Sequence, residues 1–157
     1  MAYAIIRTDA MSGTTNPEDL VSLKCTVALQ NGSVVKVGGL VSGEREVRSC
    51  STPAKADALE TLAILGSEEI KRDKAKYSKD EFTNEVDSIA RGYRLGKKHQ
   101  IFSVTKEAIS GTPAKDSLVE LDGTTKLAAV ASATSGSTTV GKIIAVEGDW
   151  YVIEVGA

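Results

Sequence analysis

The chain has few histidines and cysteines, the side chains that most often act as bases, nucleophiles or metal ligands near neutral pH. Its single histidine, His99, lies in the polar stretch Lys97–Gln100, which predicts a solvent-exposed imidazole and not the base of a catalytic triad. The two cysteines, Cys25 and Cys50, have no Cys or His partner at metal-ligand spacing. One pair is too few for a disulfide scaffold, so both are predicted to be reduced residues of strands or the core. We therefore predict no catalytic residue, no metal ligand and no cofactor.

One stretch partly matches a phosphate-binding loop. Residues Gly136–Lys142 fit the glycine and lysine positions of the P-loop pattern, but the next residue is Ile143 in place of Ser or Thr. The hydroxyl that would bind Mg²⁺ is therefore missing, and a β-branched run follows where a P-loop needs a helix N-terminus. The stretch is predicted to be a loop that enters a strand. Carboxylates are numerous, yet their spacing singles out no catalytic pair.

Two groups of aromatic and basic residues are candidates for an interaction surface. Trp150 and Tyr151 are adjacent on an expected strand, so their side chains point to opposite faces, one toward the core and the other free to contact a partner. Arg91, Tyr93 and Arg94 form the second group, with the alternative that Tyr93 only packs a loop against the fold.

Composition limits the classes of protein to which the chain can belong. Its 157 residues are 41% hydrophobic and only 4% aromatic, which suits one mid-sized domain or two small ones and excludes a long multidomain enzyme. The net charge of -2 lacks the basic excess of a nucleic-acid-binding protein. No apolar run is long enough to span a bilayer, and the N-terminus lacks a secretory signal. Synthesis and folding in the cytoplasm, with neither nucleic acid nor membrane as a partner, are expected.

Residues 1–96 are expected to hold a β-hairpin and one or two short helices. Asn31-Gly32 suits the centre of a type I′ turn that would join strands Leu23–Leu29 and Val34–Val37. Gly38-Gly39 predicts a bulge, and the alternating charges of Glu44–Cys50 predict an exposed edge strand. The remaining expectations are a strand at Tyr3–Ile6 and a loop at Thr8–Asp19.

Two helices are predicted in the middle of the chain. The first begins with Thr52 as N-cap and Pro53 at the first helical position, and it has an apolar face at residues 59–65. The second begins with a capping box at Ser78 and would bury Phe82, Val86, Ile89 and Ala90. Between them, the mixed charges of Ser67–Lys79 are typical of a solvated helix or loop.

Residues 97–157 are predicted to form a small β-barrel. Asp122-Gly123 and Glu147–Asp149 are hairpin turns, and residues 131–139 are a low-complexity loop. Closure would remove the edges of the short sheet. The predicted class is mainly β, with a barrel or sandwich-like C-terminal part. Five short β-rich runs supply its strands: Ile101–Val104, Leu118–Leu121, Leu127–Val130, Ile143–Val146 and Trp150–Val155.

Four segments form a distinctive succession of strand and turn motifs: Ile89–Leu95, Ile101–Thr105, Leu118–Leu121 and Val140–Val152. This succession resembles a family of phage head proteins, the capsid decoration or cement proteins of tailed bacteriophages. The likeness is strongest over Ile89–Val155 and weaker at the N-terminal start and hairpin. Its motifs have no catalytic signature.

The resemblance implies a non-enzymatic virion protein that docks on the outer surface of the capsid and stabilises it against internal DNA pressure. Its partner would be the major capsid protein, and family members are commonly β-rich and often homotrimers. Residues 1–96 would contain the docking part. Two alternatives stay open: another phage structural subunit, of the tail tube or head-completion type, and a small β-barrel ligand-binding module. The module would need a basic groove lined by aromatic rings to bind single strands, and the sequence lacks both features.

Overall fold

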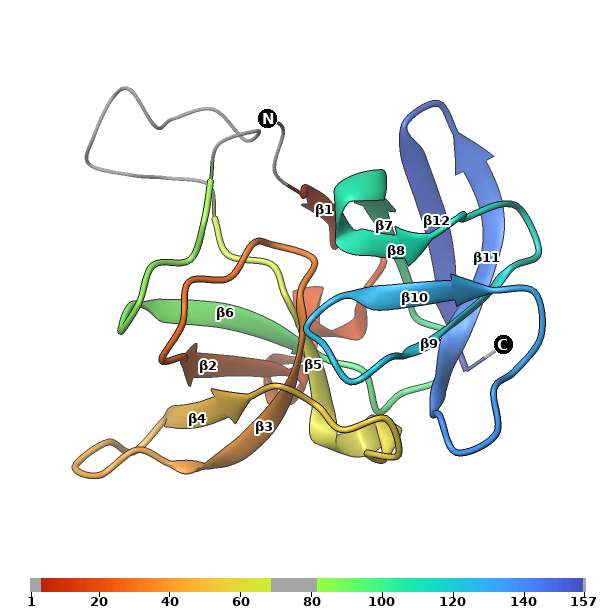
Figure 1. The fold of residues 1–157 in the computed structure, drawn as a ribbon. Helices are drawn as coiled ribbons and strands as arrows, with labels where there is room; N and C mark the ends of the chain where they lie inside the picture. Colours follow the sequence, from red (N-terminus) through yellow and green to blue (C-terminus); the bar gives the residue numbers. More distant parts are fainter. Residues whose placement is uncertain (1–3, 69–81, 157) are drawn as a thin grey trace.

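The computed structural model describes residues 4–68 and 82–156, and β-strands dominate it (Figure 1). The strands form a five-stranded closed barrel and a seven-stranded sheet. This arrangement confirms the predicted mainly β class. Within the described residues, the helical segments are short 3-10 turns: η1 (Ser12–Thr14), η2 (Pro17–Asp19), η3 (Leu59–Thr61) and η6 (Lys106–Ala108).

The barrel is closed in the strand order β2-β4-β3-β5-β6. Its strands are β2 (Leu20–Lys24), β3 (Val34–Leu40), β4 (Val47–Ser51), β5 (Leu62–Leu65) and β6 (Ile89–Arg94). The pairing between β2 and β4 is parallel, and the four other pairings are antiparallel. Small and branched side chains fill a compact interior, among them Leu23, Val35, Ala63, Leu65 and Ala90.

The seven-stranded sheet has the order β1-β7-β12-β11-β9-β10-β8. Only the pair β8–β10 is parallel; every other neighbour is antiparallel. Tight turns join β9 to β10 and β11 to β12, and Gly123 has the positive φ of 85° that such a turn demands. Its strands are β1 (Ile6–Arg7), β7 (Ile101–Thr105), β8 (Ile109–Gly111), β9 (Leu118–Leu121), β10 (Leu127–Val130), β11 (Thr139–Glu147) and β12 (Trp150–Val155).

All five strands predicted after residue 97 are confirmed, but their closure into a barrel is wrong. They are β7, β9, β10, β11 and β12, and they belong to the open sheet, whereas the closed barrel lies within residues 20–94. The reason is that β1, from the N-terminus, pairs with β7 at one edge and β8 pairs with β10 at the other. The free edges of β7 and β10, which would have to pair with each other to close the five strands, are thus occupied by other strands.

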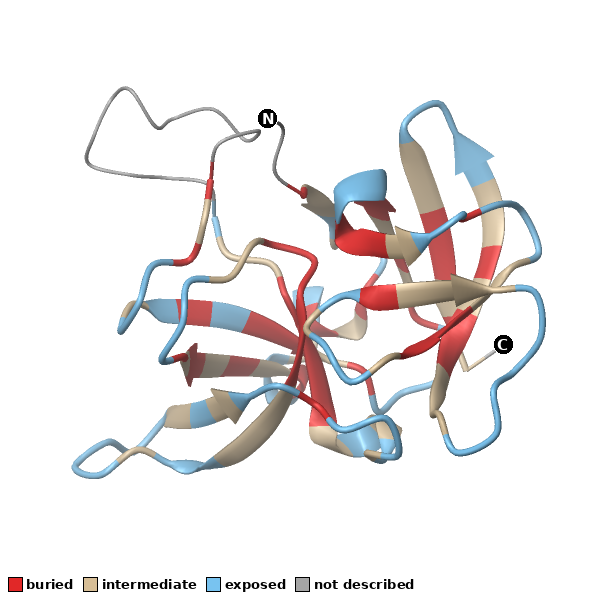
Figure 2. Cartoon of the chain, in the orientation of Figure 1, coloured by how far each residue is buried: buried red, intermediate tan, exposed pale blue. Residues whose placement is uncertain are grey.

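One apolar core joins the barrel to the sheet. It contains Val34, Leu62 and Ile64 from the barrel strands together with Phe102 and Ile153 from the sheet. Figure 2 shows the buried residues concentrated on β5 and on the sheet strands beside it. The predicted boundary at residue 96 falls between β6 and β7, where the chain passes from one set of strands to the other. That the two segments are separate domains stays a prediction.

The first predicted helix is wrong. Its apolar residues form the single turn η3 and then β5, in which Leu62, Ala63, Ile64 and Leu65 are all buried. Ala63 and Leu65 face the barrel interior, while Leu62 and Ile64 face the core shared with the sheet. A strand that is buried on both faces is a continuous apolar run, and such a run does not distinguish strand from helix by its period.

The second predicted helix is also wrong where the structure describes it. Residues 82–88 form an isolated bridge at Asn84 and a turn, and β6 begins at Ile89. Ser78–Glu81, the predicted capping box, lies outside the described residues, as does most of the charged stretch that precedes it. The i, i+4 spacing of Phe82 and Val86 therefore reflects no helix face, because Phe82 is buried and Val86 is exposed.

The predicted hairpin between residues 23–29 and 34–37 is wrong. β2 pairs with β4 and β6, and β3 pairs with β4 and β5. Asn31-Gly32 does turn the chain, with φ of 84° at Gly32, but Asn31 is buried. Its side-chain amide donates to the Ser67 carbonyl at 2.9 Å, and its Oδ1 accepts from Asn84 Nδ2 at 3.1 Å. Residues distant in sequence thus supply the hydrogen-bond partners of the buried Asn31 side chain.

Two predictions concern residues 38–50, a bulge and an exposed edge strand, and the first is confirmed. The register between β3 and β4 shifts between Val37 and Leu40, which confirms the predicted bulge at Gly38-Gly39. The predicted exposed edge strand at residues 44–50 is wrong, because β4 is paired with β3 on one side and with β2 on the other. The alternating charges correctly indicated that one face of this strand is exposed to solvent. They gave no sign that a second strand, β2, pairs with its other edge.

Candidate docking surface

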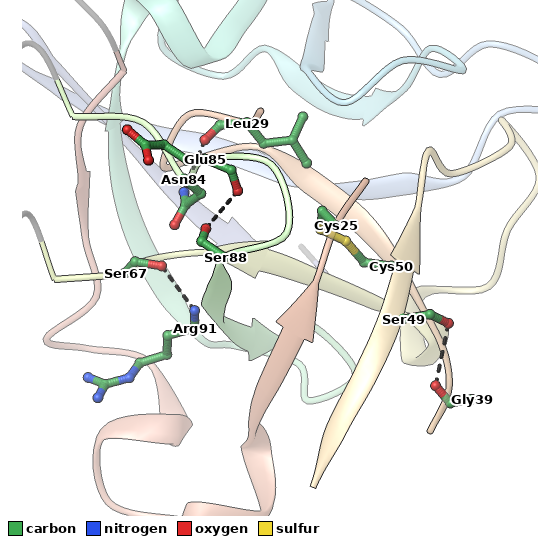
Figure 3. The surroundings of a disulfide bond; sticks show 10 residues. All are labelled: Cys25, Leu29, Gly39, Ser49, Cys50, Ser67, Asn84, Glu85, Ser88 and Arg91. Atoms are coloured by element: carbon green, nitrogen blue, oxygen red, sulfur yellow. Dashed lines mark hydrogen bonds between the residues drawn. A yellow bond between two sulfur atoms is a disulfide. The ribbon is translucent and has the colours of Figure 1, made fainter. Parts of the chain in front are cut away.

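Arg91, Tyr93 and Arg94 lie together on β6 but differ in exposure. Arg91 is exposed, and its backbone N–H donates to Ser67 Oγ at 3.0 Å (Figure 3). Its guanidinium lies 3.6 Å from Glu68 Oε1. Tyr93 is buried in the core shared with the sheet, so the packing alternative applies to it. Arg94 is half-buried, and its carbonyl accepts a hydrogen bond from Gln100. Of the three, only Arg91 presents an exposed side chain.

Trp150 and Tyr151 begin β12, and both are half-buried. Tyr151 packs against the shared core, as expected for one of the two faces. Trp150 carries the Arg7 guanidinium over its ring, 3.8 Å from the ring centroid. This cation–π contact already covers part of the indole, so Trp150 is not a bare aromatic surface.

The two predicted groups do not meet in one site, because β1 lies between them. Ile6 of β1 helps to line a polar pocket of about 150 Å³ together with Thr8, Arg91 and Tyr93. The next residue, Arg7, covers Trp150 instead. Neither Trp150 nor Tyr151 lines that pocket. The five predicted residues are thus divided between two surfaces.

A different set of residues forms an exposed apolar patch at one end of the barrel. Val27, Val86 and Ile89 are exposed by 54%, 54% and 55%, and they are three of the five large exposed hydrophobic residues in the described part of the chain. The ladder between β2 and β6 ends at Lys24↔Ile89, and Leu29 forms an isolated bridge with Asn84. Val27 lies in the bend and Val86 in the turn between these two pairs, and the Asp87 N–H donates to the Cys25 carbonyl, which holds the two segments together at this end of the barrel. We call Val27, Val86 and Ile89 the barrel-end patch.

A disulfide lies beside the barrel-end patch and overturns the expectation of two reduced cysteines. It joins Cys25, directly after β2, to Cys50 of β4, with the Cα atoms 5.3 Å apart (Figure 3). The Asp87 N–H donates to the Cys25 carbonyl at 3.1 Å, which ties the turn that carries Val86 to the same strand end. Sequence reasoning missed the bridge because the parallel pairing of β2 with β4 is what brings two cysteines 25 residues apart together.

A polar junction holds the N-terminal turns against the passage from barrel to sheet. Asp19 Oδ2 lies 2.6 Å from Lys97 Nζ and 2.8 Å from Ser12 Oγ. The hydrogen bond from Lys97 lowers the pKa of Asp19 below its ordinary value, and Ser12 acts in the same direction, against the raising effect of burial. Gln100 completes the junction by accepting from the Ser12 N–H at 3.1 Å. The predicted loop at residues 8–19 is therefore confirmed, and this polar junction packs it.

The two sequence features tested for chemistry have structural roles. His99 is exposed, as predicted, and its Nδ1 lies 2.9 Å from Glu154 Oε1. Residues after Gly136 continue into β11, so the partial P-loop match is a loop that enters a strand. Gly141 is buried there, where an added Cβ would collide with the Glu154 carbonyl of β12. Close strand packing accounts for this glycine.

Residues 4–68 and 82–156 contain no group of three His, Cys, Asp or Glu side chains placed to hold a metal ion. Among these residues, helices long and apolar enough to cross a bilayer are also absent. No protein-family model matches the chain, and no curated protein is significantly similar to it.

The barrel-end patch could not be read from sequence. Val27 was assigned to a hairpin strand, and Val86 and Ile89 to the buried face of a helix. All three are ordinary β-branched residues, which carry no signal of exposure. Only the closure of the barrel places them together at its solvent-facing end.

Proposed function

We propose that this protein binds the outer surface of a tailed-bacteriophage capsid and stabilises the assembled shell. The proposal rests on the sequence resemblance to capsid decoration proteins and on one structural observation. Most of the large exposed hydrophobic residues in the described chain gather in the barrel-end patch. Apolar side chains left exposed together are typical of surfaces that bind another protein. The major capsid protein is the proposed partner, and homotrimer formation on the shell is part of the same proposal.

The construction of the barrel supports a docking role. The residues of the patch lie at and beyond the last pair of the β2–β6 ladder, where the Leu29–Asn84 bridge and the Asp87–Cys25 hydrogen bond hold the two segments together, and the Cys25–Cys50 bond braces the same end. A surface that is ordered before binding loses little conformational entropy on docking. A small patch is then sufficient, because each bound copy favours the assembled shell by mass action.

The disulfide also supports a working place outside the reducing cytoplasm. Disulfides persist in oxidising surroundings, including the surfaces of virions, and are uncommon in cytosolic proteins. We infer synthesis in the host cytoplasm followed by residence on the capsid exterior. The role is structural: the protein contributes adhesive surface, and no bond of a substrate is made or broken.

Electron microscopy of purified phage particles tests the proposal directly. Density for this chain is expected on the outer shell, with the barrel-end patch toward the capsid. Particles that lack the polypeptide on their outer surface would overturn the proposal. Hundreds of copies per particle indicate a shell protein, whereas a dozen or fewer would favour the head-completion alternative.

Rebinding to particles stripped of the protein tests the patch itself. Val27→Asp and Val86→Asp place a charge in the apolar surface, so binding should weaken by about tenfold or more for each. Val146→Asp is the matched control, since Val146 is 44% exposed on β11 of the other sheet. Equal weakening by all three variants would show that the patch has no special role in docking.

A further inference from the structure

The parallel pairing of β2 with β4 is the seam of the barrel. Its register contains three residue pairs: Ser22↔Val47, Leu23↔Arg48 and Lys24↔Ser49. The next pair in this register is Cys25 with Cys50, so the disulfide continues the ladder by a covalent bond. The other four pairings of the barrel are antiparallel, a form slightly more stable per residue.

The strand on one side of the seam has little to hold it besides its ladders. None of the five side chains of β4 is buried, whereas all four of β5 are. The second neighbour of β4 is β3, and the bulge between Val37 and Leu40 interrupts that pairing. Segments with few buried apolar contacts open at a lower free-energy cost than the rest of a fold. The disulfide therefore joins β2 to the least buried strand of the barrel.

The bond also lies beside a pocket. Both cysteines line a pocket of about 270 Å³, whose other walls include Thr26, Val27 and Thr52. Cys25 is buried, but Cys50 is half-buried. The less buried of the two cysteines, Cys50, is therefore the one on which a small thiol in this pocket would act.

We propose that the Cys25–Cys50 bond is a thiol-exchange site that locks or releases the seam of the barrel. A small-molecule thiolate attacks Cys50 Sγ, forms a mixed disulfide with it, and displaces Cys25 as a thiolate, which takes up a proton. A second thiolate attacks the mixed disulfide, leaves as the small-molecule disulfide, and frees Cys50. Two thiols are oxidised for each protein disulfide reduced. Released from β2, β4 moves together with the far end of β3 beyond the bulge, while Val34 and Val35 of β3, strand β5 and the sheet keep the cores intact.

Hydrogen exchange of the full-length protein, before and after incubation with reduced glutathione, tests this inference. Amide exchange in residues 20–24 and 47–51 should accelerate by about tenfold or more on reduction. Exchange in β11 and β12 should stay unchanged, because these strands lie in the other sheet. Intact-mass measurement after alkylation should detect the glutathione adduct on Cys50 in folded protein.

The double variant Cys25→Ala/Cys50→Ala is the control. Its seam should exchange rapidly with or without glutathione; if it does not fold, the reduced natural chain supplies the same comparison. Three results would overturn the inference: unchanged seam exchange after full reduction, equal acceleration in β11 and β12, or a bond that glutathione reduces only in denaturant. None of these measurements involves a capsid, so they are independent of the proposed function.

Discussion

The closed barrel and the open sheet differ in how their neighbouring strands are connected. In the sheet, β9–β10 and β11–β12 are hairpins with tight turns, and each could be found from a few consecutive residues. In the barrel, β2 begins at Leu20 and pairs with β4 and β6, which begin at Val47 and Ile89. The consecutive strands β5 and β6 also pair, but residues 66–88 separate them, whereas a short turn joins β3 to β4. Local patterns therefore specify strands in both regions, but specify pairing in the sheet far better than in the barrel.

The two regions also differ in what braces them. In the sheet, the short strands β1 and β8 pair with the two outer strands, β7 and β10. In the barrel, a covalent bond joins the two strands of the seam, β2 and β4. β5 links the regions, since its alternate residues face the barrel interior and the shared core. The expected consequence is one cooperative unfolding unit with a weaker region around the seam.

The largest effect is expected from Ile64→Ala, which removes a fully buried side chain of β5 from the shared core. The free energy of unfolding should fall by about 2–5 kcal/mol, because a cavity is left at the junction of the two regions. Trp150, the only tryptophan, reports on the sheet by fluorescence during urea unfolding. Leu40→Ala, at a half-exposed position of β3, should change stability by less than about 0.5 kcal/mol.

One result would contradict that expectation. In Ile64→Ala, the urea midpoint measured by Trp150 fluorescence would stay at its natural value, while circular dichroism would detect the loss of other strands at a lower urea concentration. The barrel and the sheet would then unfold independently, and the shared core would not couple them.

Gly141→Ala should have the next largest effect, confined to the sheet. An added Cβ would meet the Glu154 carbonyl and lie 3.1 Å from the Val155 Cα, both of them backbone atoms that cannot turn aside. A loss of about 1–3 kcal/mol is expected in urea unfolding. Gly39→Ala in the barrel is the control, because no atom lies within 4 Å of its added Cβ. Equal losses for the two variants would contradict the role assigned to close packing of β11 on β12.

The junction between the regions should make stability depend on pH. Lys97 and Ser12 depress the pKa of Asp19 in the folded protein, so the contribution of Asp19 is present above its unfolded pKa. That contribution is lost as the pH falls through the lower folded value. Urea midpoints of the natural chain and of Asp19→Asn, measured from pH 7 down to pH 2.5, should differ most at pH 7 and converge in acid.

Asp149→Asn, an exposed change in the β11–β12 turn, is the control for the Asp19 measurement. A difference between the natural chain and Asp19→Asn that stays constant down to the lowest pH would show that the carboxylate charge is not what stabilises the junction.

The smallest effect is expected from Arg7→Ala, which removes the cation–π contact with Trp150. A loss of about 0.5–1 kcal/mol is expected, together with a change in Trp150 fluorescence of the folded state. Arg45→Ala, an exposed arginine of the β3–β4 turn, should alter neither. An unchanged indole spectrum in Arg7→Ala would mean that the guanidinium does not rest on the ring in solution.

Different parts of the candidate site were predictable to different degrees. The adjacency of Trp150 and Tyr151 was enough to place them on opposite faces of one strand, since side chains alternate along a strand. Their separation from Arg91 was not predictable, because it depends on β1 pairing with β7 nearly a hundred residues away. The barrel-end patch and the disulfide were missed for the same reason, as each joins residues of β2 or its end to strands distant in sequence.

The sequence by itself determined the β class, five of the six C-terminal strands, two hairpin turns and the Gly38-Gly39 bulge. Each of these follows from residues within a few positions of one another, where backbone preference and side-chain alternation act. The tertiary structure alone decided which strands close into a barrel, that residues 62–65 form a strand, and that Cys25 meets Cys50. A fully buried apolar run has no period that favours one element, and pairing between distant strands depends on burying a common core.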